Sequence, residues 1–521
     1  MAWLSPRNEI EEKTSESDIR KRREIFSEFV YYVFDSIVIP LLRSNFHVTE
    51  SNAHQNKLFY FRHDVWRALT EPSIASLKSS IYEAMDPAKA KRLLDSRQLG
   101  FSHVRLLPKA SGFRPIMNLR RRTSKLHKGR STLGRSVNSI MTPAFHVLDL
   151  ERNKQPERLE DALFSVGDIY PRVQKFKSSI ANQSKSMPAL FLAKIDVKAC
   201  FDTIPQRAVI RLIEKIVREK KYRIERFAEV TNEKQHYYRR TDRRTDRPQK
   251  KFLAAARAGN DFSDFNKLIE RNRPQTRDTV LVDAVVQQNQ PAGKVLDLIE
   301  EHVANNIVKI GKNFFRQKAG IPQGSVLSSL LCSFFYAKLQ QEHLPFLKST
   351  GSLLLRLIDD FLLITTCRAQ AEQFLQAMHN GFKDFGVEVN VAKSLANFEV
   401  EVNGEVVPRL GEGECFPYCG TLINPKTLEI TKDRNRRKAT VVTNTLTVDA
   451  SKRPGQNFYR RMLHSFKIQT MKMFMDTNLN SRSTVLGTIY QNLLESAMKL
   501  YRYWKCMPGG SRPDLGLMIG E

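Results

Sequence analysis

Three stretches of the chain are strongly apolar and a fourth has strand character, and together they predict the elements of a buried core. ALFLAKIDV (189–197) and LLLRLIDDFLLITT (353–366) have the length and composition of buried strands, and VLSSLLCSFFYAKLQ (326–340) is long enough for a buried helix. NIVKIGKNFFRQKAGIPQGS (306–325) alternates like a strand and stops at a turn rich in glycine and proline. The second stretch is unusual because two aspartates, Asp359 and Asp360, lie at its centre.

The N-terminal part has a different pattern. Residues 18–44 carry apolar side chains at helical spacing, and strand-like segments at 45–51 and 57–63 predict a hairpin after that helix. Its aromatic residues alternate with basic ones, a mixture suited to stacking on bases and holding phosphates, although an aromatic hairpin is more often simply core. Residues 101–108 and 114–119 predict a second hairpin around KASG.

The remaining segments lack strong strand patterns. Between about 206 and 304 we expect a helical insertion with very polar parts, and the section 433–505 is expected to be helical and basic. The apolar run 29–42 is expected to be too short to span a bilayer, and Asp35 and Pro40 interrupt it. Together with an N-terminus that has no apolar signal core, this predicts a soluble intracellular protein without a membrane partner.

The net charge of +29 points to a polyanion as partner, with nucleic acid first and a membrane surface second. A merely soluble basic protein would show the same excess. The six cysteines form no paired metal-binding spacing, so a zinc site is not expected, and their low number is typical of a reducing compartment.

The paired aspartates admit two interpretations. Alone, they are best explained as a tight turn with two solvated acids. Asp196, however, ends another predicted strand, and AGIPQGS lies between the two segments in the sequence. If the two strands are neighbours in one sheet, Asp196 and Asp359 meet at one edge, where two divalent cations would compensate the buried negative charge.

The order of these segments resembles that of motifs A, B′ and C of reverse transcriptases, in ALFLAKIDVKACFDTIP, RQKAGIPQGSVLSSLLCSFFY and LLLRLIDDFLLITT. VRLLPKASGFRPIMN is similar to motifs 1 and 2 of the fingers, VEVNVAKSLANF to motif D and FPYCGTLIN to the primer-grip motif E. LLRSNFHVTESNAHQNKLFYFRHDVWRAL resembles the RNA-binding T motif, and the long interval between Asp196 and Gly320 leaves room for an insertion. These two features resemble those of the telomerase reverse transcriptase family.

The resemblance implies roles for particular residues. The metal-binding catalytic triad would be Asp196, Asp359 and Asp360, with Asp359 the firmer ligand. Phe201 would be the ring that excludes a 2′-hydroxyl, although a core aromatic remains an alternative for it. The residues that would contact the incoming nucleotide are Lys109, Arg114, Phe201, Gln323, Gly324 and Lys393. Lys393 would also act as a general acid for the departing pyrophosphate. The primer grip would include Cys419 and Gly420, and the residues that would contact RNA are Phe59, Tyr60 and Arg62.

The family also implies an α+β right-hand polymerase with fingers, a palm built on an antiparallel sheet and a partial helical thumb, preceded by a remnant of the RNA-binding domain. The expected boundaries are 1–71 for the end of the RNA-binding domain, 72–185 for the fingers, 186–412 for the palm with its insertion at 206–304, and 413–521 for motif E and the thumb. Compared with the family, the chain is expected to be truncated at both ends.

The activity implied is RNA-templated addition of telomeric repeats to chromosome 3′ ends in the nucleus, with two Mg²⁺ ions. Telomerase RNA, a telomeric single-stranded DNA primer and dNTPs would be the partners. Two alternatives stay open at this point: a retroelement or intron-type reverse transcriptase, and a nucleic-acid-binding fragment without turnover.

Overall fold

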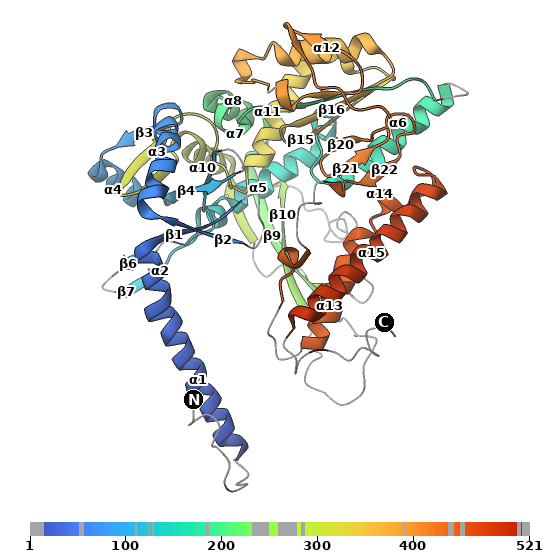
Figure 1. The fold of residues 1–521 in the computed structure, drawn as a ribbon. Coiled ribbons are helices and arrows are strands. Elements are labelled where there is room, and N and C mark those ends of the chain that lie inside the picture. Colours follow the sequence, from blue (N-terminus) through green and yellow to red (C-terminus); the bar gives the residue numbers. More distant parts are fainter. Residues whose placement is uncertain are drawn as a thin grey trace. The chain divides into compact units, whose positions relative to one another are not determined.

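The computed structural model describes residues 15–51, 57–109, 112–122, 124–127, 130–159, 161–183, 187–231, 249–258, 279–282, 287–389, 391–435, 442–448, 454–507 and 512. The chain forms two compact units, whose helices and strands are drawn in Figure 1. The first comprises Met1–Leu77 with Leu106–Pro115, and the second comprises Lys78–Arg105 with Ile116–Glu521. Helices and mainly antiparallel sheets occur together, as expected for an α+β protein.

The first unit begins with a continuous helix made of α1 (Glu16–Tyr32), the π-helical segment η1 (Val33–Val38) and α2 (Ile39–Asn45). The expected helix at 18–44 is therefore confirmed. The length argument against a membrane span is wrong, because the apolar run is part of a 30-residue helix whose best window has a mean hydropathy of 1.6 and is not buried. One such helix near the N-terminus is weak evidence for a span by length and composition alone.

The predicted N-terminal hairpin is also present. Strand β1 (Phe46–Glu50) pairs antiparallel with β2 (Leu58–Arg62), with Phe46 opposite Arg62, and α3 (His63–Ser80) follows directly. Trp66 of α3 stacks on His47 at 4.0 Å between ring centroids and contacts the ring of Phe61. These ring contacts attach the helix to the hairpin that precedes it.

The second unit contains the sheet of the palm. Strand β8 (Phe191–Asp196) lies between β16 (Asp360–Thr365) and the short β17 (Leu395–Ala396), and β15 (Ser352–Leu357) pairs with the other side of β16. All neighbouring pairs in the order β15-β16-β8-β17 are antiparallel. The two apolar segments noted in the sequence are therefore adjacent strands of one sheet.

Both faces of this sheet are buried, which explains why its strands are apolar without alternation. Side chains such as Ile195 and Phe361 face one hydrophobic cluster, which also includes side chains of α11 (Ser328–His343) and α12 (Arg368–His379). Their neighbours, such as Leu192 and Leu362, face a second cluster with α6 (Ile169–Gln183). Figure 1 shows α12 and α6 on different sides of this region.

A second sheet has the order β3-β14-β13-β4-β5. Its strands are β3 (Tyr82–Met85), β4 (Ser102–Pro108), β5 (Phe113–Met117), β13 (Ile307–Ile310) and β14 (Asn313–Gln317). The expected second hairpin corresponds to β4 and β5. The chain passes from one unit to the other within each of these strands, because Leu106–Pro115 belongs to the first unit. Helix α4 (Pro87–Ser96) lies between β3 and β4, and α5 (Val137–Lys154) follows β5 and the short strands β6 (Ser124–His127) and β7 (Arg130–Leu133).

The prediction of a helical insertion at 206–304 is wrong. Between helices α8 (Gln206–Ile216) and α10 (Ala292–Ala304), the described residues include the strands β9 (Lys221–Thr231), β10 (Gln249–Ala258), β11 (Thr279–Val282) and β12 (Gln287–Pro291). Strand β9 carries β10 on one side and β11 and β12 on the other. Its many charged residues hid the strand pattern, because Glu225 is buried and forms a salt bridge with Arg257 of β10 instead of facing water.

The C-terminal part has the expected strands and helices. Strands β20 (Phe416–Tyr418), β21 (Thr421–Ile423) and β22 (Ile430–Lys432) form a small antiparallel sheet. Helices α13 (Pro454–Gln469), α14 (Lys472–Met475) and α15 (Arg482–Cys506) follow. Phe458 of α13 packs against Tyr503 of α15, with ring centroids 5.4 Å apart.

Candidate active site

Three aspartates meet at one end of the palm sheet. Asp360 is the first residue of β16 and lies directly opposite Asp196, the last residue of β8. Asp359 lies in the turn between β15 and β16, and its carbonyl oxygen accepts a hydrogen bond from the backbone N–H of Val197 at 3.3 Å. The sequence-based expectation that these strand ends are neighbours is thus confirmed in the structure.

The carboxylates at this edge carry an electrostatic cost. Burial raises the pKa of Asp359, and the charges of Asp360 and Asp196 raise it further. Burial also raises the pKa of Asp360, and the positive charge of Lys194 opposes this effect. Both shifts mean that the ionised form is disfavoured here unless positive charge is added.

A divalent cation fits this chemistry, because carboxylate oxygens are the ligands that hard cations prefer. Within the described ranges, however, no group of three or more His, Cys, Asp and Glu side chains is already arranged around a common ion position. Binding of an ion would therefore require the three carboxylates to reorient toward each other.

Lys393 supplies a positive charge at the same edge. Its Nζ lies 2.7 Å from Oδ2 of Asp196, and 63% of its side chain is exposed. The resemblance predicted a role for this lysine near the nucleotide, and the structure brings it to the carboxylate that ends β8. Its function as a general acid stays a prediction.

The turn that carries Asp359 has a strained backbone. Ile358 has φ = +60°, a conformation that a β-branched residue rarely adopts. The fully buried guanidinium of Arg356 lies beside this turn and donates hydrogen bonds to Ser333 O at 3.0 Å, to Gln340 Oε1 at 3.1 Å and, more weakly, to Ile358 O at 3.5 Å. Arg356 thus ties the strained turn to helix α11, a role that sequence reasoning missed.

Two thiols contact the paired aspartates. Cys419 Sγ lies 3.8 Å from Oδ2 of Asp360, and burial together with the charge of Asp360 raises the pKa of Cys419 to about 12. The turn at Cys419 and Gly420 has φ values of +48° and +84°, and Tyr418 donates a hydrogen bond to the carbonyl of Asp360. The predicted primer-grip residues therefore adjoin the triad.

The second thiol belongs to Cys200, which sequence reasoning did not single out. Cys200 is buried, and the neighbouring Cys332, burial and the charge of Asp359 raise the pKa of its thiol. Its position four residues after Asp196 was a signal in the sequence, since the short helix α7 (Cys200–Thr203) begins there, directly after the end of β8.

The loop AGIPQGS packs against the start of α7. Ile321 donates a backbone hydrogen bond to Phe201 O at 2.6 Å, and Gln323 Nε2 lies 3.1 Å from both carboxylate oxygens of Asp202. Gly320 has φ = +70°, and a Cβ at this position would overlap the backbone of Phe201 and Asp202. Phe201 and Gln323 are therefore brought together, with Asp202 as a partner that the sequence analysis missed.

The nucleotide contacts predicted for Lys109 and Arg114 lie in the first unit. Both side chains are exposed, and Arg114 is on β5. Lys109 closes a turn, because its backbone N–H donates to Gly112 O at 3.0 Å. Their role in holding a triphosphate stays a prediction.

The three residues predicted to contact RNA do not share one face of β2. Tyr60 and Arg62 are exposed, while Phe59 is half-buried on the opposite face with Phe61. Arg62 also forms an exposed ion pair with Asp64 at 2.8 Å. The prediction is therefore supported by exposure for Tyr60 and Arg62, whereas the alternation of a strand directs Phe59 to the other side.

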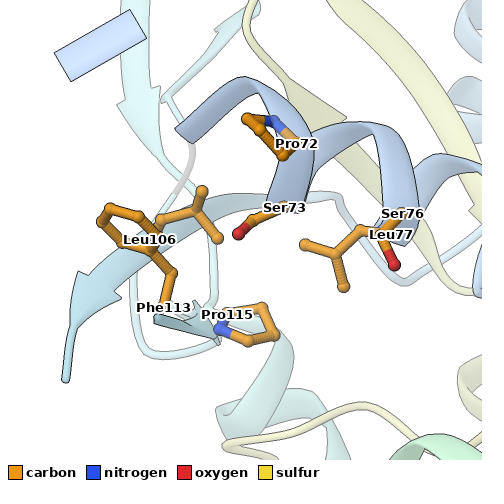
Figure 2. A pocket seen from close by; sticks show the side chains of 7 residues that line it. All are labelled: Pro72, Ser73, Ser76, Leu77, Leu106, Phe113 and Pro115. Carbon is orange, nitrogen blue, oxygen red and sulfur yellow. The ribbon is translucent and has the colours of Figure 1, made fainter. Parts of the chain in front are cut away.

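The first unit also has an open cavity of about 380 Å³ (Figure 2). Helix α3 contributes Pro72, Ser73, Ser76 and Leu77, and the facing side is formed by Leu106, Phe113 and Pro115. In Figure 2 the Ser73 hydroxyl points toward the space between these apolar side chains. No predicted site residue lines this cavity.

Comparison with known proteins finds two family models that match different parts of the chain. The model of the family described as "Telomerase ribonucleoprotein complex - RNA binding domain" matches residues 1–77. The model of "Reverse transcriptase (RNA-dependent DNA polymerase)" matches residues 286–410, which include the loop AGIPQGS and the paired aspartates. Asp196 lies outside that match and joins the site through the pairing of β8 with β16.

Telomerase reverse transcriptase of Canis lupus familiaris is 30% identical over 502 residues, which cover 94% of this chain and 43% of that protein. The enzyme of Arabidopsis thaliana is 27% identical over 529 residues, with coverage of 95% and 44%. The resemblance to telomerase reverse transcriptases is confirmed. The chain spans less than half of the length of these two telomerase relatives.

Solved telomerase structures share the fold. That of Candida albicans, described with a TWJ fragment of telomeric RNA, has a TM-score of 0.66 at 18% identity and covers 95% of this chain and 68% of its own. Apo telomerase of Candida tropicalis has a TM-score of 0.59 at 19% identity, with coverage of 95% and 72%. The expected right-hand polymerase fold of a telomerase is thereby confirmed.

Proposed function

We propose that this chain is an RNA-directed DNA polymerase that adds telomeric repeats to chromosome 3′ ends by copying a bound RNA. The observation that carries the proposal is the placement of Asp360 opposite Asp196, with Asp359 in the adjoining turn. The raised pKa values of Asp359 and Asp360 support a site that takes up positive charge.

Two Mg²⁺ ions would be held by Asp196, Asp359 and Asp360, where they would activate the attacking hydroxyl and stabilise the leaving pyrophosphate. The chain's own side chains bind and orient the substrates. Lys109 and Arg114 hold the triphosphate, because basic groups on a hairpin can reach phosphate oxygens.

The sugar and primer are selected by other residues. The ring of Phe201 excludes a 2′-hydroxyl and so favours dNTPs, while Gln323 and Gly324 contact the nucleotide and template. Lys393 donates a proton to the departing pyrophosphate. Cys419 and Gly420 position the 3′ end of a single-stranded telomeric DNA primer.

Telomerase RNA is the proposed partner of the first unit. Tyr60 and Arg62 combine an exposed ring with an exposed charge, as required for stacking on a base beside a phosphate, and Phe59 supports them from the opposite face. The net charge of +29 supports binding to nucleic acid, which should weaken steeply with added salt. This activity places the protein in the nucleus at telomeres.

The test combines the protein with Mg²⁺, dNTPs and a preannealed RNA–DNA hybrid. We expect primer extension, and Asp359→Asn should reduce its rate by at least about 10³-fold because it removes a metal-binding charge without changing shape. The exposed Asp384→Asn in the same unit is the matched control and should extend normally.

Each result has a distinct meaning. Binding of the hybrid without extension by the wild-type chain would show a binding protein without turnover. Extension that fails to give a repeating ladder on a telomeric RNA template would contradict the telomeric assignment and favour a general reverse transcriptase.

A further inference from the structure

The loop that carries Gln323 and Gly324 is held by helices from distant parts of the chain. Asn138 of α5 donates a hydrogen bond from Nδ2 to Gly324 O at 3.0 Å and accepts one from the backbone N–H of Val326 at 3.2 Å. Between these two positions lies Ser325, whose hydroxyl accepts a hydrogen bond from Leu327 N at 3.2 Å. The backbone of the loop is therefore held on both sides of Ser325.

The side chain of Ser325 is held from the insertion. His302 of α10 places Nε2 2.8 Å from Ser325 Oγ. His302 is only 1% exposed and shares the core-facing side of α10 with Val295, Ile299 and Val303. An apolar residue at this position would pack without the desolvation cost that imidazole incurs.

The imidazole is only half satisfied. Its Nδ1 is buried and has no hydrogen-bond partner within the described part of the chain. Burial, with the nearby charge of Arg97, lowers the pKa of His302 to about 4, so the ring is neutral near pH 7. A proton on Nε2 leaves only an unpaired acceptor at Nδ1, which is less costly than a buried unpaired N–H, so His302 donates to Ser325.

Helix α10 is itself anchored at the end that carries His302. Arg97 donates to Asn305 O at 2.7 Å and lies 3.3 Å from Oε1 of Glu301. Glu301 accepts a hydrogen bond from Leu99 N at 3.3 Å. The last turn of α10 is thus fixed to residues 97–100, which gives His302 a stable position from which to hold the loop.

We infer that His302 is a positioning residue through which the insertion sets the loop 323–325 for binding the incoming nucleotide. This inference rests on the proposed polymerase function. The histidine does not touch the substrate. It holds Ser325, and with Asn138 it keeps the carbonyl of Gly324 in place beside Gln323, whose side chain is held by Asp202. A mere core histidine would contribute stability without affecting nucleotide binding.

The experiment is a double-mutant cycle. His302→Phe keeps a ring but removes the hydrogen bond, and Ser325→Ala removes its partner. Each variant should raise the KM for dNTPs by about 3- to 10-fold, the effect of one lost hydrogen bond, while kcat and the KM for the RNA–DNA hybrid change less than about 2-fold. The double variant should be no worse than the worse single variant, because both changes remove the same contact.

Two further variants separate positioning from stability. His302→Gln can still donate a hydrogen bond and should recover part of the KM defect. Ile299→Val truncates the same face of α10 one turn earlier and should lower the melting temperature without raising the KM for dNTPs. An unchanged KM in His302→Phe, or additive effects in the double variant, would overturn the inference.

Hydrogen–deuterium exchange provides a readout that does not depend on turnover. The backbone amides of residues 320–328 should exchange faster in His302→Phe and in Ser325→Ala, but not in Ile299→Val. If the wild-type chain fails to extend a primer, the proposed function fails, and exchange still decides whether His302 holds the loop. Unchanged exchange in both loop variants would refute that role.

Discussion

The strand pairs β15–β16 and β9–β10 are both antiparallel and both belong to the second unit, but their surroundings differ. In the palm pair, residues 361–365 are all buried, and hydrophobic clusters cover both faces. In the insertion pair, β10 packs on α5 yet leaves Phe252 74% exposed and Lys250 and Lys251 in solvent. The same ladder of hydrogen bonds thus occurs in two very different environments.

The charges of the two pairs differ accordingly. Glu225 of β9 lies 3.0 Å from Arg257 and 4.0 Å from Arg223, so its buried carboxylate has basic partners. Asp359 and Asp360 lie beside another carboxylate, Asp196, and their pKa values are raised. Buried carboxylates whose pKa values are raised indicate a functional site, whereas a buried carboxylate that is paired with a basic group serves the local structure.

The largest difference in the free energy of unfolding is expected between variants of two matched phenylalanines. Phe361→Ala in β16 should reduce the free energy of unfolding by about 3–5 kcal/mol, because a fully buried ring leaves a cavity between packed helices. Phe252→Ala in β10 should change it by less than about 0.5 kcal/mol, since the ring is mostly in water. Denaturant unfolding of both variants measures this, and equal losses would contradict the contrast.

A smaller difference in the free energy of unfolding is expected between variants of two matched arginines. Arg356→Met leaves Ser333 O and Gln340 Oε1 without their donor and should cost about 2–4 kcal/mol, together with loss of extension as the turn of Asp359 relaxes. Arg257→Met should cost about 1–2 kcal/mol, because Arg223 also lies near Glu225. It should leave extension intact. Thermal unfolding and the extension assay together test the pair, and a loss of extension in Arg257→Met would break the distinction.

The smallest effect concerns the pH dependence of stability. Because the pKa of Asp359 is raised in the folded state, the folded state binds more protons than the unfolded state. The free energy of unfolding therefore falls as pH rises from the ordinary aspartate pKa through the raised value. Asp359→Asn should remove this loss and stabilise the chain at pH 7 in the presence of a chelator.

The comparison for this effect is Glu225→Gln in the insertion pair, which should destabilise the chain at pH 7 because it removes the negative charge from a buried carboxylate that pairs with Arg257. Urea unfolding between pH 4 and 8 measures both variants. Stabilisation by both changes, or by neither, would mean that the two environments do not treat a carboxylate differently.

Much of the palm was predictable from the sequence. Continuous apolar runs predicted buried strands, and AGIPQGS predicted a turn rich in glycine and proline. The close approach of Gly320 to the backbone of Phe201 and Asp202 came only from the structure. The sheet of the insertion was missed because the charged residues of β9 are matched by cross-strand partners such as Arg257, and such pairing is invisible in a single segment. Cys200, Asp202 and His302 were missed because the residues that they contact also lie on other segments of the chain.

The sequence by itself determined which segments are apolar, where turns occur and which side chains are chemically suited to metal, phosphate and bases, because these properties depend on local period and residue type. Only the tertiary structure decided that Asp196 lies opposite Asp360, that Lys393 and Cys419 contact these two carboxylates, and that an insertion helix holds the loop of Gly324. Those contacts join residues far apart in the chain, and they depend on strand register and packing, which no local pattern encodes.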